Sequence, residues 1–134
     1  MQYYRYLLML MLLLSTNAYA LQPKIEIVEQ FDNLRMVTFI SEKDISNSPK
    51  WNPNSEAPPL SVGEAIKAVK KFVKNSKKSI DIREIEIRPV PRYEKHWHYL
   101  IKLTNNTKQT KYDIYVVLMD GKVIPAIIEP QGYK

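Results

Sequence analysis

Two histidines one residue apart, His96 and His98, have the only spacing in the chain that is typical of a pair of metal ligands. On a strand, residues i and i+2 lie on the same face, so two imidazoles placed there can hold one ion. Glu94 is the nearest additional carboxylate, and the sequence shows no third ligand beyond it. We therefore expect two surface histidines on the solvent face of an amphipathic strand, and no metal or other cofactor.

Other common catalytic patterns are absent from the sequence. The chain has no cysteine, which excludes thiol nucleophiles, thiolate metal sites and disulfides. No serine lies in a Gly-x-Ser-x-Gly elbow, and the three glycines form no phosphate-binding loop. Glu84 and Glu86 share a strand face as paired carboxylates would, but solvated strand charges explain them. We expect that this protein is not an enzyme.

Aromatic residues are dense in the second half of the chain, where Tyr93, Trp97, Tyr99, Tyr112, Tyr115 and Tyr133 occur. We favour core packing or a buried dimer contact for these side chains, and the alternative is an amphipathic patch on the face opposite the helix that binds a protein or peptide. Trp51 stands alone in a polar loop, where we favour a buried anchor that pins the loop over an exposed residue that stacks on a ligand. The candidate partner-binding residues are Trp51, Trp97, Tyr99 and Tyr115.

The first twenty residues predict a cleavable signal peptide. Arg5 is followed by the apolar run 7–14 and by Ala18-Tyr19-Ala20, a small-x-small cleavage site. An uncleaved membrane anchor is the alternative, but the apolar run is short for a span. Export without cysteines favours the bacterial periplasm or secretion, and makes nucleic acid an unexpected partner. Residues 21–134 are then expected to form one domain.

The elements that position these residues are predicted by periodicity. Residues 24–40 alternate as strands with a turn at Asp32-Asn33, and the segment 41–59 is a Ser/Asn/Pro-rich loop. Ser61 and Glu64 form a capping box before a helix of about four turns. The apolar face of that helix turns inward, and Lys67, Lys70, Lys71 and Lys74 lie on the other face. We favour a solvated lysine face over contact with an anionic envelope surface, although the net charge of +6 suits either.

Strands with helix-facing aromatic and aliphatic residues follow over 80–128. The pair Ile80/Ile82 alternates out of phase with Ile85/Ile87, which predicts a β-bulge near Arg83-Glu84. Asp120-Gly121 predicts a type I′ hairpin turn, and Pro125 places the last strand at an edge. The expected fold class is α+β, with one amphipathic helix on an antiparallel meander of four to six strands whose other face is wetter.

Residues 60–128 resemble a PepSY domain. The helix start Leu60-Ser61-Val62-Gly63-Glu64-Ala65-Ile66, the strand Tyr99-Leu100-Ile101 and the hairpin from Tyr115 to Val123 are similar to the motifs of that family. The contiguous Asp120-Gly121 departs from the longer Asp-to-Gly loop usual in the family. The resemblance implies a PepSY-like or cystatin-like layer in an exported bacterial protein, which binds or regulates peptidases and has no catalytic site.

The leading hypothesis is therefore a noncatalytic exported module that binds a protein or peptide partner through its sheet face or an open edge. The alternative is a small metal-binding or envelope-associated protein that uses the His96/His98 pair or the lysine-rich helix face.

Overall fold

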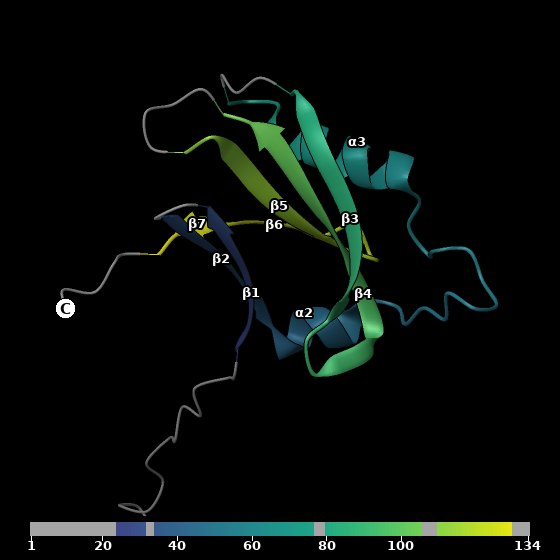
Figure 1. Ribbon diagram of the computed structural model, residues 1–134. Helices are drawn as coiled ribbons and strands as arrows, with labels where there is room; N and C mark the ends of the chain where they lie inside the picture. Colours follow the sequence, from purple (N-terminus) through teal and green to yellow (C-terminus); the bar gives the residue numbers. More distant parts are fainter. Residues whose placement is uncertain (1–23, 32–33, 77–79, 106–109, 130–134) are drawn as a thin grey trace, which may run out of the picture.

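The computed structural model describes residues 24–31, 34–76, 80–105 and 110–129. The elements are β1 Lys24–Phe31, β2 Leu34–Ser41, α2 Glu42–Asn47, α3 Val62–Val73, β3 Ile82–Val90, β4 Tyr93–Thr104, β5 Tyr112–Leu118, β6 Val123–Pro125 and β7 Ile127–Ile128. They form one four-stranded sheet and one three-stranded sheet with two helices, so the predicted α+β class is confirmed (Figure 1). No helix within these ranges is long and apolar enough to cross a membrane. The predicted signal peptide and Tyr133 lie outside the described residues.

The four-stranded sheet is the antiparallel meander β3-β4-β5-β6. The pairing of β3 with β4 shifts register between Ile82 and Glu84, which confirms the β-bulge that the phase slip predicted. The bulge lets Ile82 and Ile85 both pack on the helix side of the sheet, opposite Leu103 and Ile101.

Helix α3 covers one face of this sheet. Its predicted capping box is present: the Ser61 hydroxyl accepts a hydrogen bond from Glu64 N at 3.1 Å, and Ser61 N donates to Glu64 Oε2 at 2.8 Å. The helix buries Ala65, Val69 and Val73 at 3/4 spacing. These three side chains pack on Tyr99, Ile101, Leu103, Tyr115, Val117 and Met119 of the sheet.

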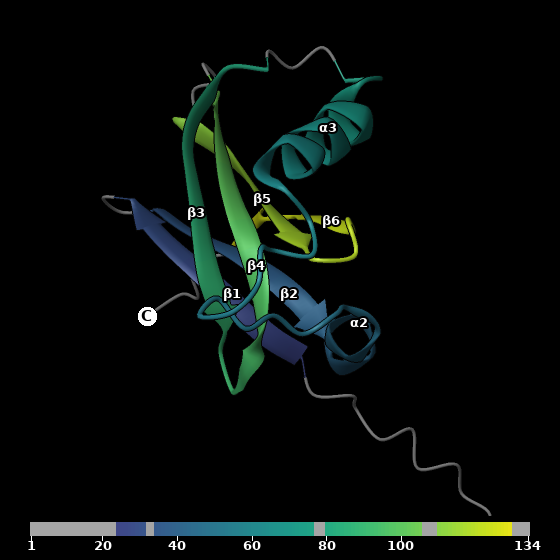
Figure 2. The ribbon, with the colours of Figure 1, turned by 90° about the vertical axis from the view of Figure 1, so that its right-hand side faces the viewer.

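The other face of the meander is also covered, so the expectation of a wetter face is wrong. The β1–β2 hairpin and β7 form the sheet β1-β2-β7, whose Ile25, Ile27, Met36 and Ile40 pack on Leu100, Ile114, Val116 and Leu118. The hairpin and α3 pack on alternate side chains of the meander and so lie on its two faces, and Figure 2 shows the hairpin strands crossing β3 and β4 obliquely. The meander is therefore the middle layer of three, and it needs large apolar residues on both faces.

The last strands connect the two sheets. β6 pairs with β5 at the edge of the meander, where Pro125 is tolerated as predicted. After Ala126, whose N–H donates to Ile114 O, the chain crosses to β2 as β7, with Ile127 opposite Val37.

Two local expectations need correction. The loop expected over 41–59 begins with the short helix α2, because Ser41 caps it and Ile45 is buried between the layers. The turn at Asp120-Gly121 is not type I′, because a type I′ turn needs positive φ at both residues and Gly121 has it (90°) while Asp120 does not. Gly121 N donates a hydrogen bond to Leu118 O, and Leu118 N donates one to Lys122 O. These bonds close a three-residue hairpin loop over 119–121, in which Gly121 occupies the left-handed position.

Candidate functional site

Trp51 and Trp97 meet at the surface, although 46 positions separate them in the chain. Their rings lie 5.0 Å apart between centroids, at an interplanar angle of 73°, which is the edge-to-face geometry that aromatic pairs prefer. Trp97 extends from β4 on the face that carries Tyr99, and Trp51 comes from the segment between α2 and α3. Both tryptophans are partly exposed.

Hydrogen bonds fix Trp51 by its polar groups. Its backbone N–H donates to Lys95 O at 2.9 Å, and its indole Nε1 donates to Glu56 O at 3.0 Å. Both donors of Trp51 are thus used within the protein, while part of its ring surface remains in contact with solvent. Trp51 therefore anchors the loop against the α3 core, and its side chain is only partly exposed.

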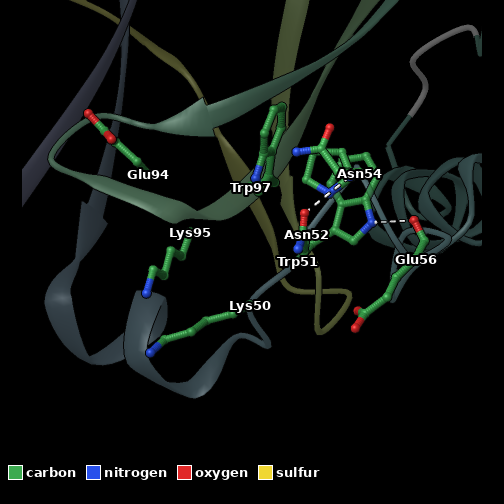
Figure 3. A pocket seen from close by; sticks show the side chains of 9 residues that line it. Lys50, Trp51, Asn52, Asn54, Glu56, Glu94, Lys95 and Trp97 are labelled. Atoms are coloured by element: carbon green, nitrogen blue, oxygen red, sulfur yellow. Dashed lines mark hydrogen bonds between the residues drawn. The ribbon is translucent and has the colours of Figure 1, made fainter.

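The tryptophans line an open pocket of about 590 Å³. The remaining lining residues are polar or proline: Lys50, Asn52, Pro53, Asn54, Glu56, Glu94 and Lys95. Figure 3 shows the two indoles at the centre of this group. Asn54 N donates to Asn52 Oδ1 at 3.1 Å, which stiffens the tip of the loop that forms one wall. The pocket therefore has an aromatic base within a lining that is otherwise mostly polar.

Of the four predicted partner-binding residues, the structure brings only Trp51 and Trp97 to this pocket. Tyr99 is 0% exposed beneath α3, and its hydroxyl donates to Leu60 O at 2.6 Å. Burial raises the pKa of the Tyr99 phenol, with a further rise from the nearby Glu64 charge. Tyr115 is also buried in the α3 core, where its ring lies 5.8 Å from that of Phe72. Both tyrosines therefore support the helix that follows the pocket loop.

The histidines are not on a solvent face, and the surface interpretation is wrong. His96 and His98 are buried on the face of β4 opposite Trp97, where the three-stranded sheet and Ile45 of α2 pack on the meander. Burial lowers the pKa of His98 to about 4, with a smaller contribution from the Arg88 charge. Burial and the Lys50 charge also lower the pKa of His96. Among the described residues, no group of three or more His, Cys, Asp or Glu is placed to hold a metal ion.

A cluster of charges between the two sheets was missed from the sequence. Lys102 Nζ lies 3.2 Å from Glu29 Oε2 and 3.0 Å from Glu84 Oε2, and 5.2 Å from the centre of the Phe31 ring. Arg88 pairs with Glu29 and Glu86 at 2.5 Å each. The hydrogen bond from Arg88 lowers the pKa of Glu86 to about 2. Glu84 and Glu86 are therefore ion-paired rather than freely solvated.

This charged cluster links β1 of the three-stranded sheet to β3 and β4 of the meander. Two signals were available in the sequence: the alternating charges on β3 and Lys102 within the apolar strand β4. The pairing with Glu29 of β1 could not be assigned without knowledge of the fold.

No protein-family model matches the chain, and comparisons with curated proteins and with solved structures found no match either.

Proposed function

We propose that this protein is a noncatalytic, exported PepSY-like module that binds a peptide segment of a partner protein at the Trp51–Trp97 pocket. The observation that carries the proposal is the partly exposed tryptophan pair, in which hydrogen bonds of the Trp51 backbone and indole hold Trp51 in place. Tryptophan is strongly favoured in binding hot spots, because a large rigid surface is desolvated at a small cost in conformational entropy.

The shape of the pocket also favours a peptide. One wall is the loop 50–56 and the other is the end of β4, so the opening is a shallow hollow on the surface and not a closed cavity. A ring-bearing or proline side chain fits against the two indoles, with Asn52 and Asn54 available to backbone groups of the peptide. Regulation of a peptidase by such a contact is the role that the PepSY resemblance implies. The succession of α3 and the meander β3–β6 supports this assignment.

A peptide library displayed on phage tests the binding proposal. We expect selected peptides to shift the indole N–H resonances of Trp51 and Trp97 in the nuclear magnetic resonance spectrum. We expect Trp51→Ala to weaken their binding at least about tenfold, the effect of losing one hot-spot residue. Phe39→Ala is the matched control, because Phe39 is an exposed aromatic residue on the three-stranded sheet. Peptides that bind without moving either indole signal would contradict the proposal.

The exported location has a separate test. Mass spectrometry of the protein produced in a bacterial host is expected to show a mature chain that begins at Leu21 and is recovered from the periplasm. A chain that retains residues 1–20 in the cytoplasm would contradict export.

A further inference from the structure

Strand β1 has a free edge in the three-stranded sheet, because among the described strands only β2 pairs with it. All eight residues of β1 pair with β2 without a register shift. The other free edges in the described part of the chain are interrupted: β3 contains Pro89 and two register shifts, β6 has three residues and ends in Pro125, and β7 has two residues. Prolines, bulges and shortness protect an edge against pairing with another chain, and β1 has none of the three.

The hydrogen bonds of the sheet show which backbone groups of β1 are unpaired. Glu129 N donates to Arg35 O, so Arg35 bonds toward the β7 side of β2. The bonding direction alternates along an antiparallel strand, so Met36 and every second residue after it bond toward β1. Their partners on β1 are the odd-numbered residues, such as Glu29 opposite Met36. The N–H and C=O groups that point away from β2, and that bond to no described residue, are those of Lys24, Glu26, Val28 and Gln30.

An open hollow of about 370 Å³ lies along this edge. Lys24, Glu26 and Val28 line it, which are three of the four residues with outward backbone groups. The rest of the lining is Ile25 and the Pro91–Arg92 turn between β3 and β4. Arg92 follows a proline and has φ of 67°, as in a type II turn, so this side of the hollow has a defined shape. The unpaired backbone of β1 therefore faces an open space.

We propose that an extended segment of a partner protein adds to the edge of β1 as an antiparallel strand and makes the three-stranded sheet four-stranded. Strand addition of this kind draws its affinity from main-chain hydrogen bonds, which the outward groups of Lys24, Glu26 and Val28 supply. The site shares no lining residue with the Trp51–Trp97 pocket, so the proposal does not rest on the peptide-binding function of that pocket.

Side chains on the outer face of the sheet define the chemistry of the segment. Val28 lies opposite Val37, and Val37 opposite Ile127, in one aliphatic row across the sheet. Val28 is 36% exposed, so an aliphatic residue beside it extends the row. Lys24 and Glu26 are exposed on the same face of β1, where neighbours of opposite charge are favourable. Because the added strand is antiparallel, its sequence is aliphatic, x, basic, x, acidic, where the x positions share the buried face of β1.

A second copy of this chain does not have that pattern. In an antiparallel pair of β1 strands, Lys24 lies opposite Glu26 only if the overlap is limited to residues 24–26. The registers with the longest overlap place Glu26 opposite Val28 or Gln30 instead, which leaves both charges without an opposite neighbour. Charge complementarity therefore favours a different chain at this edge.

Two short peptides test the proposal in the isotope-labelled protein, with binding followed by the backbone amide signals of Lys24, Glu26 and Val28. Acetyl-Thr-Val-Ile-Lys-Val-Glu-Thr-amide has the expected pattern. Acetyl-Thr-Val-Ile-Glu-Val-Lys-Thr-amide has the same composition with the charges exchanged. We expect the first peptide to move the three amide signals downfield, as new hydrogen bonds do, and to bind about three- to tenfold more tightly than the second.

Methylation of single peptide nitrogens separates strand addition from side-chain contact. In the added strand, the N–H of the lysine points toward Glu26 O, and the N–H of the preceding isoleucine points away from β1. We expect methylation of the lysine nitrogen to weaken binding at least about tenfold, through the lost hydrogen bond and the crowding of the methyl group. Methylation of the isoleucine nitrogen is the matched control and is expected to have little effect. Equal binding of the two methylated peptides would overturn the proposal.

A double variant assigns the charge preference to β1. Lys24→Glu with Glu26→Lys exchanges two exposed charges, so the variant is expected to fold and to prefer the second peptide. Asp81→Arg with Arg83→Asp exchanges an exposed pair before and within β3, and is expected to keep the original preference. Equal affinity for the two peptides, or a preference that survives the exchange in β1, would overturn the proposal.

Two further results would also contradict it. Shifts of the Lys24, Glu26 and Val28 amide signals with protein concentration alone would show that a second copy occupies the edge. A peptide that moves the indole signals of Trp51 and Trp97 in place of these amide signals would bind in the Trp51–Trp97 pocket. The first result leaves the function proposed for that pocket untouched, and the second supports it.

Discussion

His98 shows how one buried side chain makes stability depend on pH. It is 1% exposed, and neither ring nitrogen has a hydrogen-bond partner within the described structure. Because its pKa falls from 6.5 to about 4 on folding, the unfolded chain binds a proton that the native state does not bind between these values. The contribution of neutral His98 to the free energy of unfolding is fully present above pH 6.5 and is lost as the pH falls toward 4.

We therefore expect the free energy of unfolding to fall by up to about 3 kcal/mol between pH 7 and pH 4 because of His98. His98→Leu, which leaves no polar atom to protonate, is expected to remove most of this slope in urea unfolding followed at several pH values. The loss from Glu86, whose pKa falls from 4.5 to about 2, belongs to lower pH and is expected to remain. An unchanged slope above pH 4.5 in His98→Leu would contradict this assignment.

Lys102 is a second residue whose environment decides its effect. Its side chain is 9% exposed between Glu29 and Glu84. Burial disfavours the ammonium, but the hydrogen bonds to both carboxylates outweigh burial and raise the pKa of Lys102. Lys102→Met is expected to cost about 1–3 kcal/mol, because the largely covered Glu29 keeps Arg88 as its only partner among the described residues.

Arg83→Met is the matched control for the Lys102 variant. Arg83 pairs with Asp81 at 4.0 Å on the surface, with both side chains more than half exposed. Such a pair contributes less than about 1 kcal/mol, so chemical denaturation is expected to separate the two variants clearly. Equal losses would show that burial of the Lys102 cluster has no energetic consequence.

At the scale of elements, replacement by alanine is expected to change stability in opposite directions at the two described glycines. Gly121 has φ of 90° in the β5–β6 turn, so an alanine there is strained even though no atom lies within 4 Å of its added Cβ. Gly63 lies in the first turn of α3, where the nearest atom to an added Cβ is Ser61 Oγ at 3.9 Å. Gly121→Ala is expected to destabilise by about 1–2 kcal/mol, and Gly63→Ala to stabilise by about 0.5–1 kcal/mol. Thermal unfolding measures both, and the same sign for both would contradict the assigned backbone conformations.

The α3 cap joins the pocket loop to the core. Ser61 caps the helix, and the preceding carbonyl of Leu60 accepts the Tyr99 hydroxyl. Ser61→Ala is expected to cost about 1 kcal/mol, as measured by urea unfolding. Ser55→Ala changes an exposed hydroxyl in the same loop and is expected to leave stability within about 0.5 kcal/mol. A Ser61 variant as stable as the Ser55 variant would show that the cap contributes little.

At the scale of the whole molecule, local signals were sufficient for most elements and insufficient for their assembly. The capping box at Ser61, the bulge after Ile82 and the edge proline Pro125 each depend on neighbouring residues, so the sequence predicts them directly. The covering of the second sheet face depends on β1, β2 and β7, which come from the two ends of the chain. The alternation of residues along β4 assigns His98 to one face of the strand. It does not show whether water or a second sheet lies against that face.

The candidate site was predictable only in part, because it too depends on contacts between residues far apart in the chain. The sequence indicates both Trp51 and Trp97 as aromatic candidates. The contact between their rings depends on the loop that folds back along β4, which the sequence does not show. Tyr99 and Tyr115 have equal aromatic character and lie in the core, because the position of α3 above them is a tertiary property. Residue type therefore indicated the candidates, and only the fold separated surface from core.

The crossing of the chain from β6 to β7 has a consequence for the order of folding. The three-stranded sheet joins the first described strand with the last, so its third strand becomes available only after residues 127–128 have been synthesised and released from the ribosome. Contacts between distant parts of a chain form slowly, because a long loop must close before they are made. The α3–meander unit is local and is expected to form first, with the β1–β2 hairpin joining it afterwards. Until the hairpin packs on it, the apolar side of the meander that carries His98 remains uncovered and open to chaperones.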